Sequence, residues 1–331
     1  FELIMATVRA RFDFEPDAEL AVEIDPRFIS DEQIRSYVKA GINRVSIGVQ
    51  DFDAKVQMAI HRLQPFAQVK SVVERLRAAG IEAINFDLIY GLPLQSEASI
   101  LNTVKKTLSL APSRIALFGY AHVPWMKKQQ KALERFPMPD QRQRARLASL
   151  ARSRLEDAYR PIGIDHFARA GDSLEQAEQS RSLRRNFQGY TTDQADTLLA
   201  FGPSSISRLP QGFVQAHTDT QIWMKQVRAG ELPAARGIAL SEDDKLRSHI
   251  IEALMCNLAV DVEAAAHLYH ADPTQFLPAL QALHPYLDHG MAVLSGWHLT
   301  IHPQWRVAAR SIAALFDAYL QSGEQRHSVA V

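Results

Sequence analysis

AINFDLIY, residues 83–90, is an apolar run that carries a carboxylate, Asp87, near its end. A buried strand of a parallel sheet normally consists of continuous Val, Ile and Leu. Three further apolar runs share this form, with Glu23, Gln50 and His122 near their ends. A carboxylate or amide in such a place costs free energy unless it is paired or faces a cavity. In a βα barrel that cavity lies at the carboxyl ends of the strands, so the four side chains predict one shared ligand site.

The composition predicts a globular cytoplasmic protein. The 331 residues contain 37 acidic and 37 basic side chains, so no global charge favours nucleic acid or an anionic membrane. The apolar runs fall short of the ~20 residues that a membrane span needs, and no secretory leader is visible. A single cysteine, Cys256, fits a reducing compartment. The chain opens at Phe1 in what reads as the tail of a helix, which suggests a piece of something longer.

Strand and helix patterns alternate from residue 18 to residue 167. The expected strands lie at 20–25, 44–49, 83–90 and 114–121, with a fifth at 160–167, and helices between them at 30–41, 65–80 and 96–112. Such spacing predicts parallel strands joined by right-handed crossovers. Four or five strands cannot close an eight-stranded barrel, so the expected fold is an open, partial (βα) barrel of the α/β class.

The rest of the chain predicts a second, smaller domain. We expect residues 1–240 to form the partial barrel with its site-covering loops, and residues 241–331 to form a mainly helical domain. Helices near 241–258, 262–269 and 274–283, a hairpin at 291–301 and a helix at 307–320 resemble a winged helix. Its presumed recognition face lacks a dense Lys and Arg cluster, so we do not expect nucleic-acid binding.

Each polar strand-end residue also has an ordinary structural explanation when taken alone. Glu23 is compatible with an ion pair to Arg44, Gln50 with a cap on the following turn, and Asp87 with a role in holding loop amides. Together they suit a ligand rich in hydroxyl and ammonium groups, such as a nucleoside joined to an amino acid. Arg62 offers a bidentate fork for that ligand's carboxylate, although alone it reads as a solvent-facing helix residue.

Longer segments resemble known enzymes. AVEIDP at 21–26, RVSIGVQDF at 44–52 and NFDLIYGLP at 85–93 resemble barrel segments of radical S-adenosylmethionine enzymes. Within that superfamily, the chain is similar to the oxygen-independent coproporphyrinogen III oxidase (coproporphyrinogen dehydrogenase) family at YAHVP (120–124), DHFA (165–168) and RNFQGYTT (185–192). The likeness covers nearly the whole chain in consistent order. It implies a radical S-adenosylmethionine barrel that lacks its first strands, followed by the helical domain.

The resemblance implies roles for particular residues. Glu23 matches a residue that contacts the cluster-bound S-adenosylmethionine, and Ile206 is a less direct match to a contact with its adenosine. The matches to contacts with a second S-adenosylmethionine are Gln50, Arg62, Asp87 and, through its backbone, Ala121. Substrate candidates are Arg169, Arg184, Arg185, His166, Asn186 and Tyr190. Residues 181–185 also fit a solvated helix end, and His166 also fits a satisfied core histidine.

The family's reaction is implied in the same way. A reduced [4Fe-4S] cluster cleaves S-adenosylmethionine to a radical, which removes hydrogen from a propionate of coproporphyrinogen III. Carbon dioxide leaves, a vinyl group remains, and two rounds give protoporphyrinogen IX in anaerobic haem biosynthesis. The implied partners are coproporphyrinogen III and a reductant such as a flavodoxin-type electron donor, with the chain a monomer.

The chain departs from the family at the cluster. Three thiolates from a Cys-x3-Cys-x2-Cys loop hold the cluster, and this sequence contains no such loop. Cys256 lies on an apolar helical stripe and is expected to be a buried core residue. We therefore expect a chain that lacks the first two barrel strands, holds no metal and does not turn over alone.

Three other interpretations stay open. One is a haem-binding relative that keeps the barrel and acts as a chaperone, which the stretch Asn186–Thr192 disfavours. Another is a natural pseudoenzyme with a scaffolding role, which an upstream reading frame encoding three cysteines would exclude. The third is a metal-free barrel enzyme, for which no catalytic dyad is visible.

Overall fold

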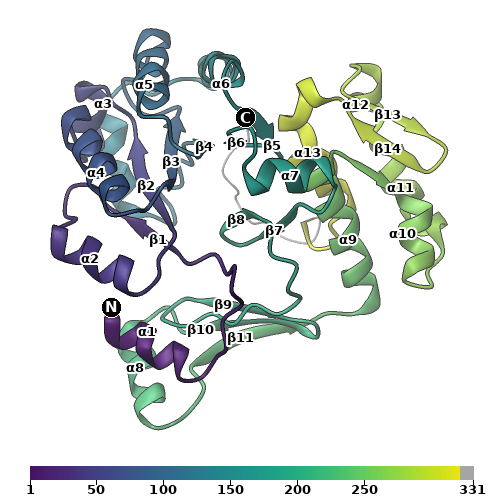
Figure 1. Cartoon of the computed structure of the whole chain (residues 1–331). Coiled ribbons are helices and arrows are strands. Elements are labelled where there is room, and N and C mark those ends of the chain that lie inside the picture. Colours follow the sequence, from purple (N-terminus) through teal and green to yellow (C-terminus); the bar gives the residue numbers. More distant parts are fainter. Residues whose placement is uncertain (321–331) are drawn as a thin grey trace. The chain divides into compact units, whose positions relative to one another are not determined.

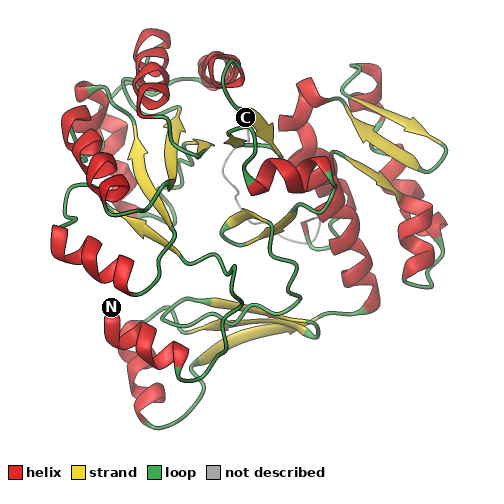
Figure 2. Ribbon diagram, viewed as in Figure 1, coloured by secondary structure: helices red, strands yellow, loops and turns green. Residues whose placement is uncertain are grey.

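The computed structural model describes residues 1–320, so the end of the predicted domain 241–331 lies outside the described residues. The described residues divide into two compact units, 1–175 and 176–320. Figures 1 and 2 show their helices and strands. The second unit therefore begins earlier in the chain than the predicted boundary at residue 240. Among residues 1–320, no helix combines the length and the apolar character needed to cross a bilayer.

A six-stranded sheet forms the centre of the first unit, in the order β1-β2-β3-β4-β6-β5. The four predicted parallel strands are confirmed as β1 (Ala21–Ile24), β2 (Arg44–Gln50), β3 (Ala83–Tyr90) and β4 (Arg114–Gly119). The prediction of a single strand at 160–167 was wrong. A turn with Gly163 in the left-handed region divides it into β5 (Arg160–Ile162) and β6 (His166–Ala168), and β6 runs antiparallel to β4.

The helices bury one face of this sheet. Predicted helices are present as α2 (Asp31–Lys39), α4 (Phe66–Ala78) and α5 (Glu97–Leu110), and the expected capping box of Ser30 and Gln33 begins α2. Every second residue of β2 and β3 is buried in the core with side chains of α4 and α5. Since side chains alternate along a strand, the intervening residues point to the opposite face. Helices that the sequence analysis did not specify are α3 (Ala54–Ala59), α6 (Gln141–Glu156) and the 3-10 helix η1 (Lys128–Arg135), and the first segment forms α1 (Glu2–Arg9).

The first part of the second unit has more regular structure than the sequence suggested. After α7 (Ser173–Gln179), which spans the boundary, a hairpin pairs β7 (Arg184–Asn186) with β8 (Gly189–Thr191). A three-stranded antiparallel sheet then forms from β9 (Ile206–Leu209), β10 (Gly212–Ala216) and β11 (Ala234–Ala239), with α8 (Thr220–Arg228) between the last two. These strands are short, and β11 is exposed along its whole length, so they lack the apolar pattern that reveals a strand.

The remainder is helical, as expected, with a small sheet. Helix α9 (Glu242–Asn257) packs against α13 (Ala309–Ala313), and Leu246, Ile250 and Leu254 of α9 are buried. The predicted hairpin is present and pairs with one further strand in the order β12-β14-β13. The elements are β12 (Ala259–Asp261), α10 (Val262–Leu268), η2 (Pro273–Phe276), α11 (Leu277–Gln281), α12 (His284–Asp288), β13 (Ala292–Ser295), β14 (His298–Ile301), η3 (Pro303–Ala308) and η4 (Ala314–Phe316).

Candidate functional site

The strand register gathers polar side chains on the sheet face that the helices leave free. Glu23 of β1 is aligned with Ser46 of β2, which is aligned with Asn85 of β3. One step further along, Asp87 of β3 is aligned with Ala116 of β4, whose antiparallel neighbour is His166. Aligned residues of neighbouring strands project from the same side of a sheet. We call this set of Glu23, Ser46, Asn85, Asp87 and His166 the polar face.

Asp87 is the centre of a hydrogen-bonded group on the polar face. Ser46 Oγ donates to its Oδ2 at 3.0 Å, and Asn85 Nδ2 donates to its Oδ1 at 2.9 Å. Burial raises the pKa of Asp87, while these two hydrogen bonds and nearby His166 act in the opposite direction. Asn85 Oδ1 is buried with no hydrogen-bond partner. The group thus holds an acceptor oxygen without a partner, Asn85 Oδ1, beside the carboxylate of Asp87.

Glu23 is exposed and makes no hydrogen bond or ion pair with any residue between 1 and 320. The structural alternative for it, an ion pair with Arg44, is not formed. Arg44 Nε instead lies 2.7 Å from a carboxylate oxygen of Glu19. Glu23 therefore offers an unpaired carboxylate at the edge of the polar face.

Arg62 is held at the carboxyl end of β2 by a short, tightly bonded loop. Gln57 Nε2 donates to the carbonyl oxygens of Asp51 (2.8 Å) and Gln64 (2.9 Å). Gln64 Nε2 in turn donates to the Gly48 and Val49 carbonyls. These bonds fold the segment after α3 back onto β2, with His61 in the left-handed region. In this way the loop holds Arg62 at the carboxyl end of β2.

The guanidinium of Arg62 is fixed from three sides. Its Nη2 donates to Gly48 O at 3.0 Å, its Nε donates to Gln64 Oε1 at 3.1 Å, and its Nη1 lies 3.3 Å from Asp25 Oδ2. Burial lowers the pKa of Arg62, and Asp25 opposes that shift. The simple alternative of a solvent-facing arginine is therefore wrong, because the side chain lies against the sheet.

Gly48 makes room for two of the predicted site residues. A Cβ at this position would lie 2.7 Å from Gln50 Nε2 and 3.0 Å from Arg62 Nη2. The register between β2 and β3 shifts between Gly48 and Gln50, and Gln50 has a φ of 65°. This irregularity turns the Gln50 side chain toward Gly48 and Arg62, so Gln50 and Arg62 are neighbours.

A buried carboxylate that the sequence analysis did not single out lies beside this end of β2. Asp51 Oδ1 accepts from Asp53 N (2.6 Å) and Thr103 Oγ1 (2.8 Å), and its Oδ2 accepts from Gln95 Nε2 (2.6 Å). Burial raises the pKa of Asp51, and these hydrogen bonds oppose the shift. All its bonds go to the protein, so Asp51 orders the loops rather than receiving a ligand. The aspartate directly after a buried strand was its only signal in the sequence.

The loop after β4 contains two predicted residues, of which His122 is already paired. Its Nε2 lies 3.1 Å from Glu134 Oε1, and its Nδ1 lies 3.4 Å from the Tyr120 hydroxyl. The Ala121 carbonyl accepts from Gln130 Nε2 at 3.0 Å. Of the four polar strand-end residues, His122 is thus the one bound into its own loop.

The two predicted substrate residues of β6 lie at different places. His166 is on the polar face, and its Nδ1 lies 2.8 Å from Asp165 Oδ1. Arg169 follows β6, and because β6 runs antiparallel, it lies near the amino end of β4, where its backbone N–H donates to Ser113 O. Arg169 therefore lies away from the carboxyl ends of the parallel strands, and its role as a substrate contact stays a prediction.

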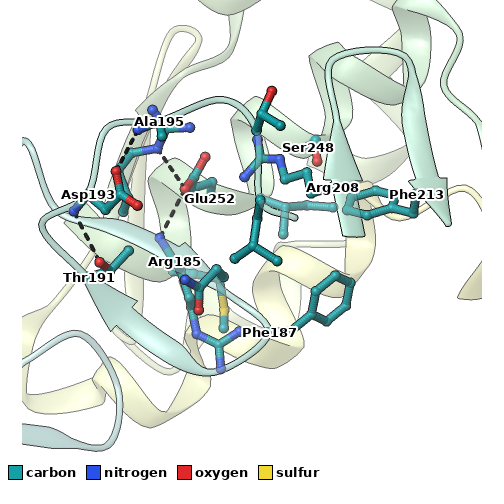
Figure 3. Close-up of a pocket in the computed structure, with 15 residues that line it drawn as sticks. Arg185, Phe187, Thr191, Asp193, Ala195, Arg208, Phe213, Ser248 and Glu252 are labelled. Atoms are coloured by element: carbon teal, nitrogen blue, oxygen red, sulfur yellow. Dashed lines mark hydrogen bonds and ion pairs between the residues drawn. The ribbon is translucent and has the colours of Figure 1, made fainter. Parts of the chain in front are cut away.

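The remaining predicted residues belong to the second unit. Arg184, Arg185, Asn186 and Tyr190 lie on the β7–β8 hairpin, and Ile206 begins β9. The Tyr190 hydroxyl donates to Met255 O at 2.9 Å in a buried position, so it ties the hairpin to α9. Arg184 and Arg185 line a cavity of about 350 Å³ that Figure 3 shows. The same cavity is lined by Arg208, which the sequence analysis missed.

The residues of this chain do not fit an iron–sulfur cluster. The sequence has one cysteine, and Cys256 is 2% exposed on α9. Burial raises the pKa of its thiol to about 12, whereas a cluster ligand must be a thiolate. Within residues 1–320, no three His, Cys, Asp or Glu side chains are grouped to hold a metal ion. The prediction that Cys256 is a buried core residue is confirmed.

The fold and the polar face define the class of the protein. Residues 1–107 match the Radical SAM superfamily. The chain is 46% identical to the oxygen-independent coproporphyrinogen III oxidase of Bradyrhizobium diazoefficiens, over 100% of this chain and 74% of that protein. It is 39% identical to the enzyme of the same name from Helicobacter pylori, over 96% and 70%. The solved structure of coproporphyrinogen III oxidase (HemN) from Escherichia coli superposes with a TM-score of 0.90 at 32% identity, over 96% of this chain and 74% of that one.

The chain is therefore of the radical S-adenosylmethionine class. More narrowly, it belongs to the oxygen-independent coproporphyrinogen III oxidase family, whose members are oxidoreductases. Membership implies a [4Fe-4S] cluster and S-adenosylmethionine as cofactors. The predicted family, fold class and enzyme class are thereby confirmed.

Proposed function

We propose that this chain carries the S-adenosylmethionine and porphyrinogen sites of an enzyme that converts two propionates of coproporphyrinogen III to vinyl groups. The product is protoporphyrinogen IX, in anaerobic haem synthesis. The observation that carries the proposal is the polar face, where Glu23 and Asn85 Oδ1 have no partner and Asp87 is held by two hydrogen bonds. Such a set of acceptors beside a fixed guanidinium has no structural purpose that the described residues reveal.

The polar face fits S-adenosylmethionine chemically. Its amine and ribose hydroxyls are donors, and its sulfonium is a cation, so carboxylates and an amide oxygen are suitable partners. Arg62 carries the complementary charge for its carboxylate. When bound, S-adenosylmethionine supplies the oxidising power for the reaction. We assign Glu23 to one molecule, and Gln50, Arg62, Asp87 and the Ala121 backbone to a second.

The role of the chain's own residues is to bind and orient. Asp87 is largely buried, so a charge–charge contact there is screened less by water than one at the surface. His166 lies beside Asp87 on the polar face and already contacts Asp165. We assign it to hold a propionate near the polar face by donating from its Nε2.

The chain does not contain the three cysteines that hold the cluster, because its 331 residues include only one. We propose that this chain does not bind the cluster or turn over alone. We also propose that the active protein is a cytoplasmic monomer that accepts electrons from a flavodoxin-type donor. Size-exclusion chromatography and reconstitution with flavodoxin test these two points.

The experiment that tests the function uses a chimera in which the Bradyrhizobium relative supplies the three cluster cysteines. Under anaerobic conditions, it should convert coproporphyrinogen III to protoporphyrinogen IX. Substituting Glu23 or Asp87 by alanine should abolish this conversion and leave the cluster absorbance unchanged. Full conversion by both variants would refute the assignment of the polar face.

The single cysteine favours a second candidate, a binding protein without catalytic activity, either a haem-binding chaperone or a pseudoenzyme. A chaperone predicts a stable complex with haem and no vinyl formation, and a pseudoenzyme predicts neither. A cluster-loaded chimera that binds S-adenosylmethionine yet forms no vinyl groups would support this candidate over the enzyme.

A further inference from the structure

We infer that the cavity of the second unit binds a carboxylate-bearing pyrrole edge of the porphyrinogen, with Arg185 and Arg208 as its carboxylate ligands. This inference rests on the proposed function and names the substrate contacts within it. The cavity has a volume of about 350 Å³. It is formed by the β7–β8 hairpin, the loop after it, strands β9 and β10, and helix α9 (Figure 3).

The positive charges in this cavity exceed the negative ones. Three arginines (184, 185 and 208) and two carboxylates (Asp193 and Glu252) line it, which leaves one net positive charge. Glu252 Oε1 is occupied by Arg184 Nε and by the Arg185 backbone N–H, both at 3.1 Å. Asp193 Oδ1 accepts from Ala195 N at 2.8 Å within its own turn. Arg185 and Arg208 therefore remain without a carboxylate.

Both of these guanidiniums lack the partners that such groups normally have. Arg185 Nε is buried without a hydrogen-bond partner, and its guanidinium carbon lies 5.4 Å from the centre of the Tyr190 ring. The backbone of Arg208 pairs with Leu198, but its side chain makes no hydrogen bond or ion pair within residues 1–320. Leaving a buried donor unsatisfied costs free energy, and a bound carboxylate accepts from such donors bidentately.

The other walls of the cavity are apolar. Phe187 and Phe213 meet edge to face with ring centres 5.6 Å apart, and Leu198 and Met255 lie nearby. Phe187 is 63% exposed, so its ring is accessible to a ligand. Aromatic walls beside two unpaired guanidiniums suit a flat apolar ring that carries an acidic arm. A pyrrole with its propionate has this chemistry.

The size of the cavity limits what enters it. Its volume lies near the lower end of the roughly 300–1,000 Å³ found for small-molecule pockets. The cavity therefore receives one edge of the tetrapyrrole, with one or two propionates, and not the whole macrocycle.

The test is direct titration of the 331-residue chain with coproporphyrin III, the stable oxidised form of the substrate, followed by porphyrin fluorescence. Arg185→Ala and Arg208→Ala should each weaken binding roughly tenfold or more, the expected loss of a charged hydrogen bond. The coproporphyrin affinity of Arg208→Lys should lie between those of wild type and Arg208→Ala, because lysine keeps the charge but cannot donate bidentately to a carboxylate. The tetramethyl ester of coproporphyrin III has no free carboxylate. It should bind weakly, and with equal affinity, to the wild-type chain and to all three variants, measured in the same detergent-containing buffer.

Arg236→Ala is the matched control. This exposed arginine of β11 donates to Gln215 and does not line the cavity, so coproporphyrin affinity should be unchanged. Arg208→Ala should keep the wild-type unfolding temperature, because that side chain makes no bond within the described residues. Wild-type affinity in both cavity variants, or equal affinity for ester and free acid, would overturn the inference.

This titration needs neither the cluster nor S-adenosylmethionine, so its failure is distinguishable from failure of the proposed function. If the chimera forms vinyl groups but the cavity variants bind and react normally, the cavity assignment is wrong and the function stands. The opposite result is also possible. If the chimera forms no vinyl groups, but the chain binds coproporphyrin more tightly than its ester and loses that preference in the Arg185 and Arg208 variants, the cavity assignment stands and the function is wrong.

Discussion

Asp87→Asn should make the unliganded chain more stable while weakening its binding of S-adenosylmethionine. The substitution is isosteric, and the hydrogen bonds around Asp87 survive it. The new amide oxygen can accept from Asn85 Nδ2, as Oδ1 does now at 2.9 Å. The new amide nitrogen can donate to Ser46 Oγ, which now donates to Oδ2 at 3.0 Å. What disappears is the cost of burying a negative charge.

The sign and the pH dependence of this gain follow from the raised pKa of Asp87. A carboxyl whose folded pKa lies above its unfolded value is favourable to folding while protonated, and that contribution is lost as pH rises through the folded pKa. The variant's advantage should therefore be absent below about pH 4, near the unfolded pKa. It should grow to roughly 1 kcal/mol at pH 8. Urea unfolding of both proteins over this pH range measures it.

Asp51→Asn is the matched comparison, because Asp51 is also buried and also has a raised pKa. All three of its hydrogen bonds come from the protein, and the new amide nitrogen would face Gln95 Nε2, another donor. Gln95 cannot turn its amide over without losing the bond from Gly91 N to its Oε1. Asp51→Asn should therefore destabilise the chain by about 1–3 kcal/mol.

The binding half of the prediction uses isothermal titration of S-adenosylmethionine. Loss of one charged hydrogen bond should weaken the affinity by roughly 10- to 100-fold in Asp87→Asn. A variant that is no more stable than wild type at pH 8, or that binds S-adenosylmethionine equally well, would refute the reasoning. The first result would mean that burial does not penalise Asp87, and the second that the polar face is not the site.

Three further predictions test other parts of the structure. Gly48→Ala should push Arg62 and Gln50 aside, because its Cβ would lie 3.0 Å and 2.7 Å from their ends; calorimetry should show S-adenosylmethionine affinity at least tenfold lower, with the unfolding temperature nearly unchanged. Tyr190→Phe should lower the free energy of unfolding by about 1 kcal/mol, because it leaves Met255 O unpaired, and fluorescence titration should show unchanged coproporphyrin affinity. Cys256, with its pKa raised to about 12 by burial, should resist iodoacetamide at pH 8 until urea unfolds the chain, as mass spectrometry would show.

Each of these has an outcome that contradicts it. An S-adenosylmethionine affinity of Gly48→Ala equal to that of wild type would mean that Arg62 and Gln50 do not contact this ligand. Weaker porphyrin binding by Tyr190→Phe at unchanged stability would make its hydroxyl a substrate ligand after all. Rapid alkylation of native Cys256 would mean that the thiol is accessible.

The parallel strands could be predicted because they follow from periodicity, whereas Ser46 and Asn85 of the polar face were not singled out. A run of seven or eight mostly apolar residues with Asp87 or Gln50 near its end indicates both a buried strand and a polar side chain that needs an explanation. Alternation then places Asp87 and Ser46 on one face, as their hydrogen bond shows. The reversal at Gly163 was not predictable in this way, because three-residue strands are too short to show a period. The position of Arg169 near the amino end of β4 depends on the same reversal, so it was not predictable either.

The cavity of the second unit could not be predicted from the sequence, for a different reason. Arg208 lies on a strand of four half-buried residues with no apolar alternation, and no motif marks it. Its significance depends on which carboxylates are already taken, and only the contacts of Glu252 with Arg184 and the Arg185 backbone reveal that. Tyr190 shows the converse, since its place in a family-like stretch suggested a substrate contact, whereas its hydroxyl holds the hairpin to α9.

A formal net charge of zero concealed two local charge imbalances of opposite sign. The first unit has spare acceptors at Glu23 and Asn85, which suits a ligand with a sulfonium and an amine. The second unit has spare guanidiniums at Arg185 and Arg208, which suits a ligand with four carboxylates. One group in each set, Asn85 Oδ1 and Arg185 Nε, is buried without a partner, and such a group costs folding free energy in the empty protein. The ligand chemistry proposed for each unit therefore follows from these local groups and not from the overall composition.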